Sequence, residues 1–225
     1  MSYMFSHMGS WHRQNGGENQ DALCMDGSAD FAVIALADGV SSCREAKRGA
    51  EIACHTLTEL MLCQGQRLLS FPIQDVIGFA LNRIRNELQK QGGRMEDYAS
   101  TVSAVLLDRK NRRLLCLNLG DCLIGGTEAG KCRILAAPSD SSSGCYVTTT
   151  RNAEQVTAVC SLPVGQLDSV FLCSDGLWQY LMTGEKFTDE SSELLTNHAY
   201  RELERQMEAE DGLDDASFIV LELEE

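Results

Sequence analysis

Hydrophobic positions in this chain occur in short runs that are separated by Gly, Asp, Asn and Ser. Each run is rich in Val, Ile, Leu or Thr and is bounded by turn-forming residues, a pattern typical of β-strands. The predicted strands are Ala22–Met25, Phe31–Ala37, Thr101–Leu107, Leu114–Leu119, Cys132–Ala136, Cys145–Thr149, Val170–Cys173 and Ser217–Leu223.

Helical periodicity appears between these runs. Apolar residues recur at i, i+3, i+4 and i+7 in Ile73–Gln91, and Arg44–Leu62 gathers Ala, Leu and Met near one face. Both segments are therefore predicted to be helices that pack on a core. A third segment, Glu190–Glu208, is more polar, and we expect it to form a helix on the surface.

The order of these elements predicts the fold class. Two strands are followed by two long helices, a run of strands, a helix and a last strand. Strands segregated from helices favour an α+β fold with mostly antiparallel sheets over a doubly wound parallel sheet. The 225 residues include only three prolines and no Ser/Gly/Pro-rich linker, so we expect residues 1–225 to form a single domain.

Charge and composition exclude several classes of function. A formal net charge of −14 argues against nucleic-acid binding, which needs a basic surface, but is compatible with divalent cations. No apolar window approaches the ~18 residues of a membrane span, and the first residues lack the pattern of a secretory signal. Ten cysteines occur without a C-x-x-C pair, which indicates reduced thiols in a cytoplasmic protein.

Acidic residues recur where the predicted strands begin or end. Asp38 and Asp175 each follow an apolar strand and precede Gly, and Asp121 follows another strand. Asp21 and Asp214 precede strands. Because antiparallel neighbours bring the start of one strand beside the end of the next, these carboxylates can meet at one edge. A bound divalent metal is the simplest way to keep such a cluster ionised.

The alternative interpretation is that these residues only form turns. Asp-Gly is a common turn dipeptide, since Asp bonds its own backbone and Gly tolerates positive φ. The pattern G-x-x-x-x-G-K at Gly125–Lys131 likewise lacks the Ser or Thr and the helix of a phosphate-binding loop. We therefore interpret Gly125–Gly130 as a hairpin turn, as we do the charged segment DRKNRR.

The motifs as an ordered set resemble a known family. In chain order they are NQDAL, ALADGVSSCREAKRGAEIA, STVSAVLLD, LNLGDCLIG, LCSDGLWQYL and DDASFIVLEL. They resemble the metal-dependent protein phosphatases of type 2C, especially the compact bacterial branch, over about residues 8–224. The resemblance implies two packed, mostly antiparallel β-sheets flanked by helices, with a two-metal site at one end.

The resemblance also implies a ligand set for Mn²⁺ or Mg²⁺. The Asp residues that match it are Asp21, Asp38, Asp175 and Asp214. The backbone carbonyl of Gly39 matches a further ligand, and Asp38 matches the ligand that bridges the two ions. Asp121 matches an Asp that joins Asp175 at a third, weaker metal ion in bacterial members.

A phosphatase mechanism follows from that resemblance. Two cations roughly 3.5–4 Å apart share a water and lower its pKa, and the resulting hydroxide attacks the phosphorus of phosphoserine or phosphothreonine without a covalent intermediate. The implied substrate is a phosphorylated protein from a Ser/Thr kinase pathway. We expect a monomer that binds neither nucleic acid nor membrane.

Several residues depart from the family pattern. Gln20 stands where relatives usually have Glu, and Val40, which cannot donate a proton, follows Gly39. The residue that grips the substrate phosphate is either Arg13, as a bidentate anion binder, or His12, and both can instead be ordinary surface residues.

These departures support a second hypothesis. A catalytically weak or inactive relative would use the same fold as a phosphoprotein-binding regulatory module. Retention of the core Asp residues favours the enzyme. The motif at the last strand also contains two adjacent acids, Asp214 and Asp215; the first matches the family ligand better, but the spacing does not decide between them.

Overall fold

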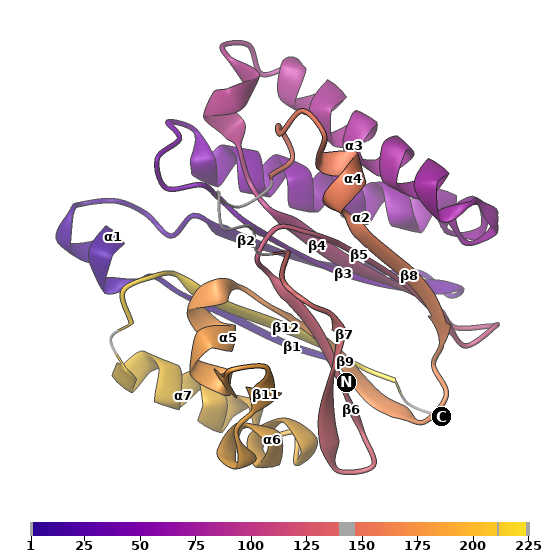
Figure 1. The fold of residues 1–225 in the computed structure, drawn as a ribbon, viewed down its shortest axis with the longest axis vertical. Helices are drawn as coiled ribbons and strands as arrows, with labels where there is room; N and C mark the ends of the chain where they lie inside the picture. Colours follow the sequence, from indigo (N-terminus) through magenta and orange to yellow (C-terminus); the bar gives the residue numbers. More distant parts are fainter. Residues whose placement is uncertain (1, 140–146, 211, 224–225) are drawn as a thin grey trace.

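The computed structural model of the chain describes residues 2–139, 147–210 and 212–223. Figure 1 shows two stacked β-sheets between two groups of helices. One sheet has the order β2 (Asp21–Gly27), β3 (Phe31–Asp38), β4 (Val102–Asp108), β5 (Arg113–Leu119) and β8 (Ala158–Pro163). The other has the order β1 (Ser2–His7), β12 (Ala216–Glu222), β9 (Leu167–Cys173), β6 (Leu123–Glu128) and β7 (Lys131–Ala136).

Neighbouring strands in both sheets are antiparallel. The long helices α2 (Ala46–Ser70) and α3 (Ile73–Gln89) cover the outer face of the β2–β8 sheet (Figure 1). Helices α5 (Asp175–Leu181), α6 (Asp189–Thr196) and α7 (Tyr200–Glu210) cover the other sheet. The predicted α+β fold of two packed antiparallel sheets flanked by helices is confirmed.

Shorter elements complete the described chain. They are α1 (Ser10–Gln14), the 3₁₀ helix η1 (Met95–Tyr98), α4 (Ala153–Val156) and the two-stranded hairpin β10 (Met182–Thr183) and β11 (Lys186–Phe187). Among the residues that the structure describes, no helix combines the length and apolar character needed to cross a membrane.

Apolar side chains fill the three spaces between these four layers. Successive side chains of a strand point to opposite faces, so Val33 of β3 packs with Leu57 of α2, whereas Ile34 packs between the two sheets. Phe171 of β9 packs with Phe218 on the side of α5, α6 and α7. Because the inner strands are buried on both faces, their sequences are continuous apolar runs, which made them predictable.

Strands β1, β6 and β8 were not predicted from the sequence. β1 and β8 lie at sheet edges and contain exposed positions. β6 extends into the segment interpreted as a hairpin turn, Gly125–Gly130, and that interpretation is wrong for Gly125 to Glu128. A Cβ at Gly125 would lie 2.3 Å from the ring of Phe171, so glycine at this position makes room for packing within a strand.

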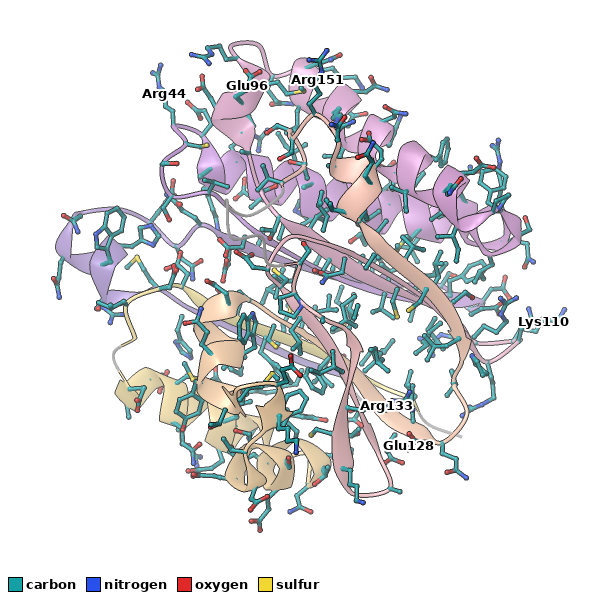
Figure 2. All side chains as sticks on the ribbon, in the orientation of Figure 1. Arg44, Glu96, Lys110, Glu128, Arg133 and Arg151 are labelled. Atoms are coloured by element: carbon teal, nitrogen blue, oxygen red, sulfur yellow. The ribbon has the colours of Figure 1, made fainter. Side chains whose placement is uncertain are left out.

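The charged segment DRKNRR does form the turn between β4 and β5. Figure 2 shows Lys110 of this turn projecting from one end of the molecule, and Glu128 near Arg133 on the β6–β7 hairpin. The Nη1 of Arg133 lies 2.8 Å from a carboxylate oxygen of Glu128.

The predicted strand Cys145–Thr149 is wrong where the structure describes it. Its first two residues lie outside the described residues, and residues 147–149 form a turn. Arg85 of α3 donates hydrogen bonds of 2.9 Å to the backbone carbonyls of Thr148 and Thr150. These tertiary contacts override the strand propensity of the threonines.

The single helix predicted over Glu190–Glu208 is also wrong. Two helices, α6 and α7, are separated by residues 197–199. His198 in this break has a φ of 55°, in the left-handed region that an α-helix cannot contain. The break turns α7 so that Leu203 and Met207 pack on the sheet.

Two helical glycines test this packing as a matched pair. A Cβ at Gly49 of α2 would lie 2.1 Å from the carbonyl oxygen of Tyr98 in η1, whereas a Cβ at Gly78 of α3 would meet no atom within 4 Å. We predict that Gly49→Ala lowers the free energy of unfolding by about 2 kcal/mol through overpacking. Gly78→Ala should raise it by up to about 1 kcal/mol, because Ala is the better helix former. Chemical denaturation measures both, and equal effects would contradict the close approach of α2 and η1.

Candidate functional site

Two acidic residues face each other at one end of the β2–β8 sheet. Asp21 is the first residue of β2 and Asp38 is the last residue of β3, and the two are directly opposite in register. The antiparallel pairing alone places these carboxylates together, although they are distant along the chain.

The second sheet brings three further Asp residues to the same end. The end of β9 pairs with the starts of both β6 and β12. Asp175 follows β9 as the first residue of α5, Asp121 precedes β6, and Asp214 precedes β12. The charges of Asp121, Asp175 and Asp214 all act on Asp38, so the five predicted carboxylates lie in one cluster.

Backbone contacts fix the neighbouring Gly39. Its N–H donates to the carbonyl of Gln20 at 3.2 Å, and a Cβ there would lie 2.7 Å from backbone atoms of Ala46 at the start of α2. Any side chain would collide with that helix, so only glycine lets the chain pass. Lys47 of α2 donates a 2.8 Å hydrogen bond to the carbonyl of Asp21 and so ties the helix to β2.

Burial and mutual repulsion disfavour ionisation within the cluster. Burial, followed by the charges of Asp21 and Asp175, raises the pKa of Asp38 well above its usual range. Burial also raises the pKa of Asp21 to about 8, with the charges of Asp215 and Asp175 adding to the shift. The pKa of Asp175 is raised to about 7 by burial and then by the charge of Asp214.

Several of these carboxylate oxygens are buried without a hydrogen-bond partner. They are both side-chain oxygens of Asp21 and the Oδ1 atoms of Asp121 and Asp175. A buried acceptor without a partner is costly, and such groups commonly mark an ion site. Hard carboxylate oxygens are the ligands that Mg²⁺ and Mn²⁺ prefer. The donor chemistry of the cluster therefore fits divalent cations.

The cluster is not drawn together into a finished coordination shell. Among the described residues, no group of three or more His, Cys, Asp and Glu side chains converges closely enough to hold a metal ion. The carboxylates are thus arranged as repelling neighbours, and a cation would have to draw their oxygens inward.

The adjacent acids Asp214 and Asp215 have different environments. Asp215 is 3% exposed, and its two oxygens accept hydrogen bonds of 2.7 Å from the backbone N–H groups of Gly9 and Gln20. Asp214 is exposed, and its negative charge raises the pKa of Asp38 and the pKa of Asp175. This division favours Asp214 as the ligand and gives Asp215 the task of holding the loop between β1 and β2.

The two candidates for gripping phosphate also differ. His12 is 3% exposed, and its Nδ1 atom lies 3.0 Å from Oδ1 of Asp215, although the alignment is not that of a hydrogen bond. Arg13 is exposed, donates a hydrogen bond to the carbonyl of Met8, and lines a pocket of about 140 Å³ with Asp214. The structure places Arg13 in a pocket with one acid of the cluster, Asp214, and buries His12 beneath the loop.

Sequence reasoning missed the contacts that support the cluster. The indole N–H of Trp178 donates a 2.7 Å hydrogen bond to the carbonyl of Asp121, and Lys47 holds the carbonyl of Asp21. Helical spacing predicts only that Trp178 is a core residue. Nothing in the sequence indicates which group accepts the hydrogen bond from its indole N–H. Asp215 is the supporting residue that the sequence did indicate, because it stands next to the candidate ligand Asp214.

Comparison with known proteins identifies the family. A sequence model described as protein phosphatase 2C matches residues 8–210. The chain belongs to the protein phosphatase 2C family. The match spans the cluster from Asp21 to Asp175. Comparison with curated protein sequences gave no match.

Solved structures of phosphatases share the fold of this family member. A bacterial serine phosphatase superposes with a TM-score of 0.70 at 13% identity, covering 99% of this chain and 97% of that one. The serine/threonine phosphatase Stp1 from Staphylococcus aureus gives 0.70 at 14% identity, with 100% and 95% covered. The serine/threonine phosphatase of S. agalactiae gives 0.66 at 17% identity, with 98% of each chain covered.

The role of Asp215 can be tested by hydrogen exchange. We predict that Asp215→Ala removes the acceptor of two buried N–H groups and lowers the free energy of unfolding by about 2 kcal/mol or more. Backbone amide exchange should accelerate at Gly9 and Gln20. Asp214→Ala is the matched control and should leave both amides protected; unchanged exchange in Asp215→Ala would contradict the proposed bracing.

The raised pKa of Asp175 predicts a pH effect on stability. In the folded state the Asp175 carboxyl keeps its proton up to about pH 7, whereas in the unfolded chain it releases the proton at about pH 3.9. This contribution to stability is therefore fully present below about pH 4 and is lost as the pH rises through about 7. Urea unfolding in chelator measures this effect. The free energy of unfolding of Asp175→Asn, relative to that of the native chain, should rise by up to about 1.4 kcal/mol per pH unit between about pH 4 and pH 7. Parallel stability profiles would contradict the burial of this carboxyl.

Proposed function

We propose that the protein is a metal-dependent phosphoserine/phosphothreonine protein phosphatase. The observation that carries the proposal is the cluster of buried carboxylates with unpartnered oxygens at one end of a protein phosphatase 2C fold. Such a cluster is costly as a purely structural feature, because several desolvated like charges repel one another. Binding of divalent cations turns the same arrangement into a stable one.

Each acidic residue has a role in this proposal. The carboxylates of Asp21, Asp38, Asp175 and Asp214 and the carbonyl of Gly39 would hold two Mn²⁺ or Mg²⁺ ions. Asp38 would be the central ligand, since the charges of the other four acids all act on it. Asp121, held through its carbonyl by Trp178, would join Asp175 in holding a third ion.

The chain must bind and orient a phosphate dianion within an acidic protein. When bound, the cations supply an activated water for in-line attack on phosphorus and offset the charge of the transferring group. Arg13 is an exposed cation that shares a pocket with Asp214, and its guanidinium suits bidentate contact with phosphate oxygens. Val40 has no ionisable group, so this position does not protonate the leaving serine or threonine.

The wider setting extends the same proposal. We place residues 1–225 in one domain that acts as a monomer in the cytoplasm, on phosphoproteins that a Ser/Thr kinase produces. Support comes from the sheets and helices that share continuous apolar layers and from thiols that are free at every described cysteine.

A second candidate function is a phosphoprotein-binding module without turnover. Two residues favour it. Gln20 stands where relatives usually have Glu, and its buried Oε1 has no hydrogen-bond partner. Val40 cannot donate a proton to a leaving group. This module would bind phosphopeptide in calorimetry but release no phosphate at saturating Mn²⁺.

Phosphate release from a phosphothreonine peptide tests the two functions. We predict hydrolysis that requires Mn²⁺ or Mg²⁺, is abolished by chelator, and falls by about 100-fold or more in Asp38→Ala and Asp175→Ala, because the metals supply the nucleophile. Asp26→Ala is the control, since Asp26 is an exposed acid near the far end of β2. Hydrolysis that is indifferent to chelator would refute the enzyme as proposed.

A further inference from the structure

Two cysteines face each other across neighbouring strands, away from the acidic cluster. Cys116 of β5 and Cys160 of β8 are directly opposite in the antiparallel register. Cys116 belongs to the apolar layer between the two sheets, and Cys160 packs against that layer, so both side chains point to the same side. Directly opposed residues have Cβ atoms about 4.5–5.5 Å apart, close to the ~3.5–4.5 Å range of disulfides.

The two thiols are chemically unequal. Cys160 is half-buried on β8, an edge strand, whereas Cys116 is 1% exposed. The interaction of the two thiols lowers the pKa of Cys160 to about 7 and raises the pKa of Cys116. The Cys160 thiol also donates a 4.0 Å hydrogen bond to the carbonyl of Leu135. An accessible thiolate beside a buried thiol is the arrangement of a reactive cysteine with a resolving partner.

We propose that Cys116 and Cys160 form an oxidation site that a peroxide converts into a disulfide between β5 and β8. The Cys160 thiolate attacks one peroxide oxygen, the O–O bond breaks, and a sulfenic acid forms with release of hydroxide. The Cys116 sulfur, having lost its proton, then attacks the Cys160 sulfur and displaces a second hydroxide. The two sulfurs lose two electrons to the peroxide, and the hydroxides take up the two thiol protons as water.

This site joins the edge strand covalently to the interior of its sheet. Within the described part of the chain, β8 has one strand neighbour, β5. The segment that leads into β8 includes α4 and the turn at residues 147–149. A disulfide would fix the end of this segment to β5. The inference stands apart from the proposed phosphatase activity, because neither thiol belongs to the acidic cluster.

Peptide mass spectrometry tests the oxidation site directly. The native chain, in chelator at about pH 7.5, is treated with hydrogen peroxide, alkylated and digested. We expect a linked peptide pair containing Cys116 and Cys160, which dithiothreitol separates. Cys160→Ser should yield no such link, and Cys116→Ala should accumulate a Cys160 sulfenic acid that dimedone traps.

Cys132→Ser supplies the matched control. Cys132 is also a half-buried strand cysteine, but burial raises its pKa to about 11. This variant should form the disulfide at the native rate, and iodoacetamide should modify Cys160 in the native chain at least about 10-fold faster than Cys132. Reduced Cys116 and Cys160 after peroxide, or linkage of another pair such as Cys24 with Cys54, would overturn the proposal. Cys160 is half-buried, so Cys160→Ser disturbs the core less than Cys116→Ala does. If Cys116→Ala fails to fold, the loss of the linked peptide in Cys160→Ser still tests the proposal.

Discussion

Repulsion among desolvated carboxylates is the constraint on which the rest of this structure depends. Like charges in a partly buried site interact far more strongly than in water, because the surroundings screen them poorly. The negative charges of four other acids repel the charged form of Asp38 in this way. A fold that brings these residues together must therefore supply a compensating charge or hold the carboxyls as neutral acids, and the family of this chain favours the first solution.

The two-sheet architecture makes the cluster unavoidable. Register places Asp21 opposite Asp38, and the pairing of β9 with β6 and β12 gathers the other three acids at the same end. The surrounding contacts are made by backbone groups and buried side chains: Asp215 holds the loop before β2, and Trp178 holds the carbonyl of Asp121. Rigid supports of this kind keep the acids close despite their repulsion, so that a cation has only to draw their oxygens inward.

The sequence predicted those parts of the molecule that local pattern determines. Strands buried on both faces, such as β3 and β9, appear as apolar runs, and the acids at their ends can be located by inspection. What failed depended on tertiary contacts: Gly125 looks like a turn residue until Phe171 packs over it, and Thr148 looks like a strand residue until Arg85 binds its carbonyl. The same reason explains the site. Asp21 and Asp38 were predictable, but the separate duties of Asp214 and Asp215 become visible only when the loop from β1 is in place.

A crystal structure grown in Mn²⁺, with anomalous scattering data collected at the manganese edge, tests the central claim most directly. The account predicts two strong anomalous peaks among Asp21, Asp38, Asp175 and Asp214, with an Asp38 oxygen shared between them. Carboxylates that turn away from one another in saturating Mn²⁺, with no anomalous peak between them, would contradict it.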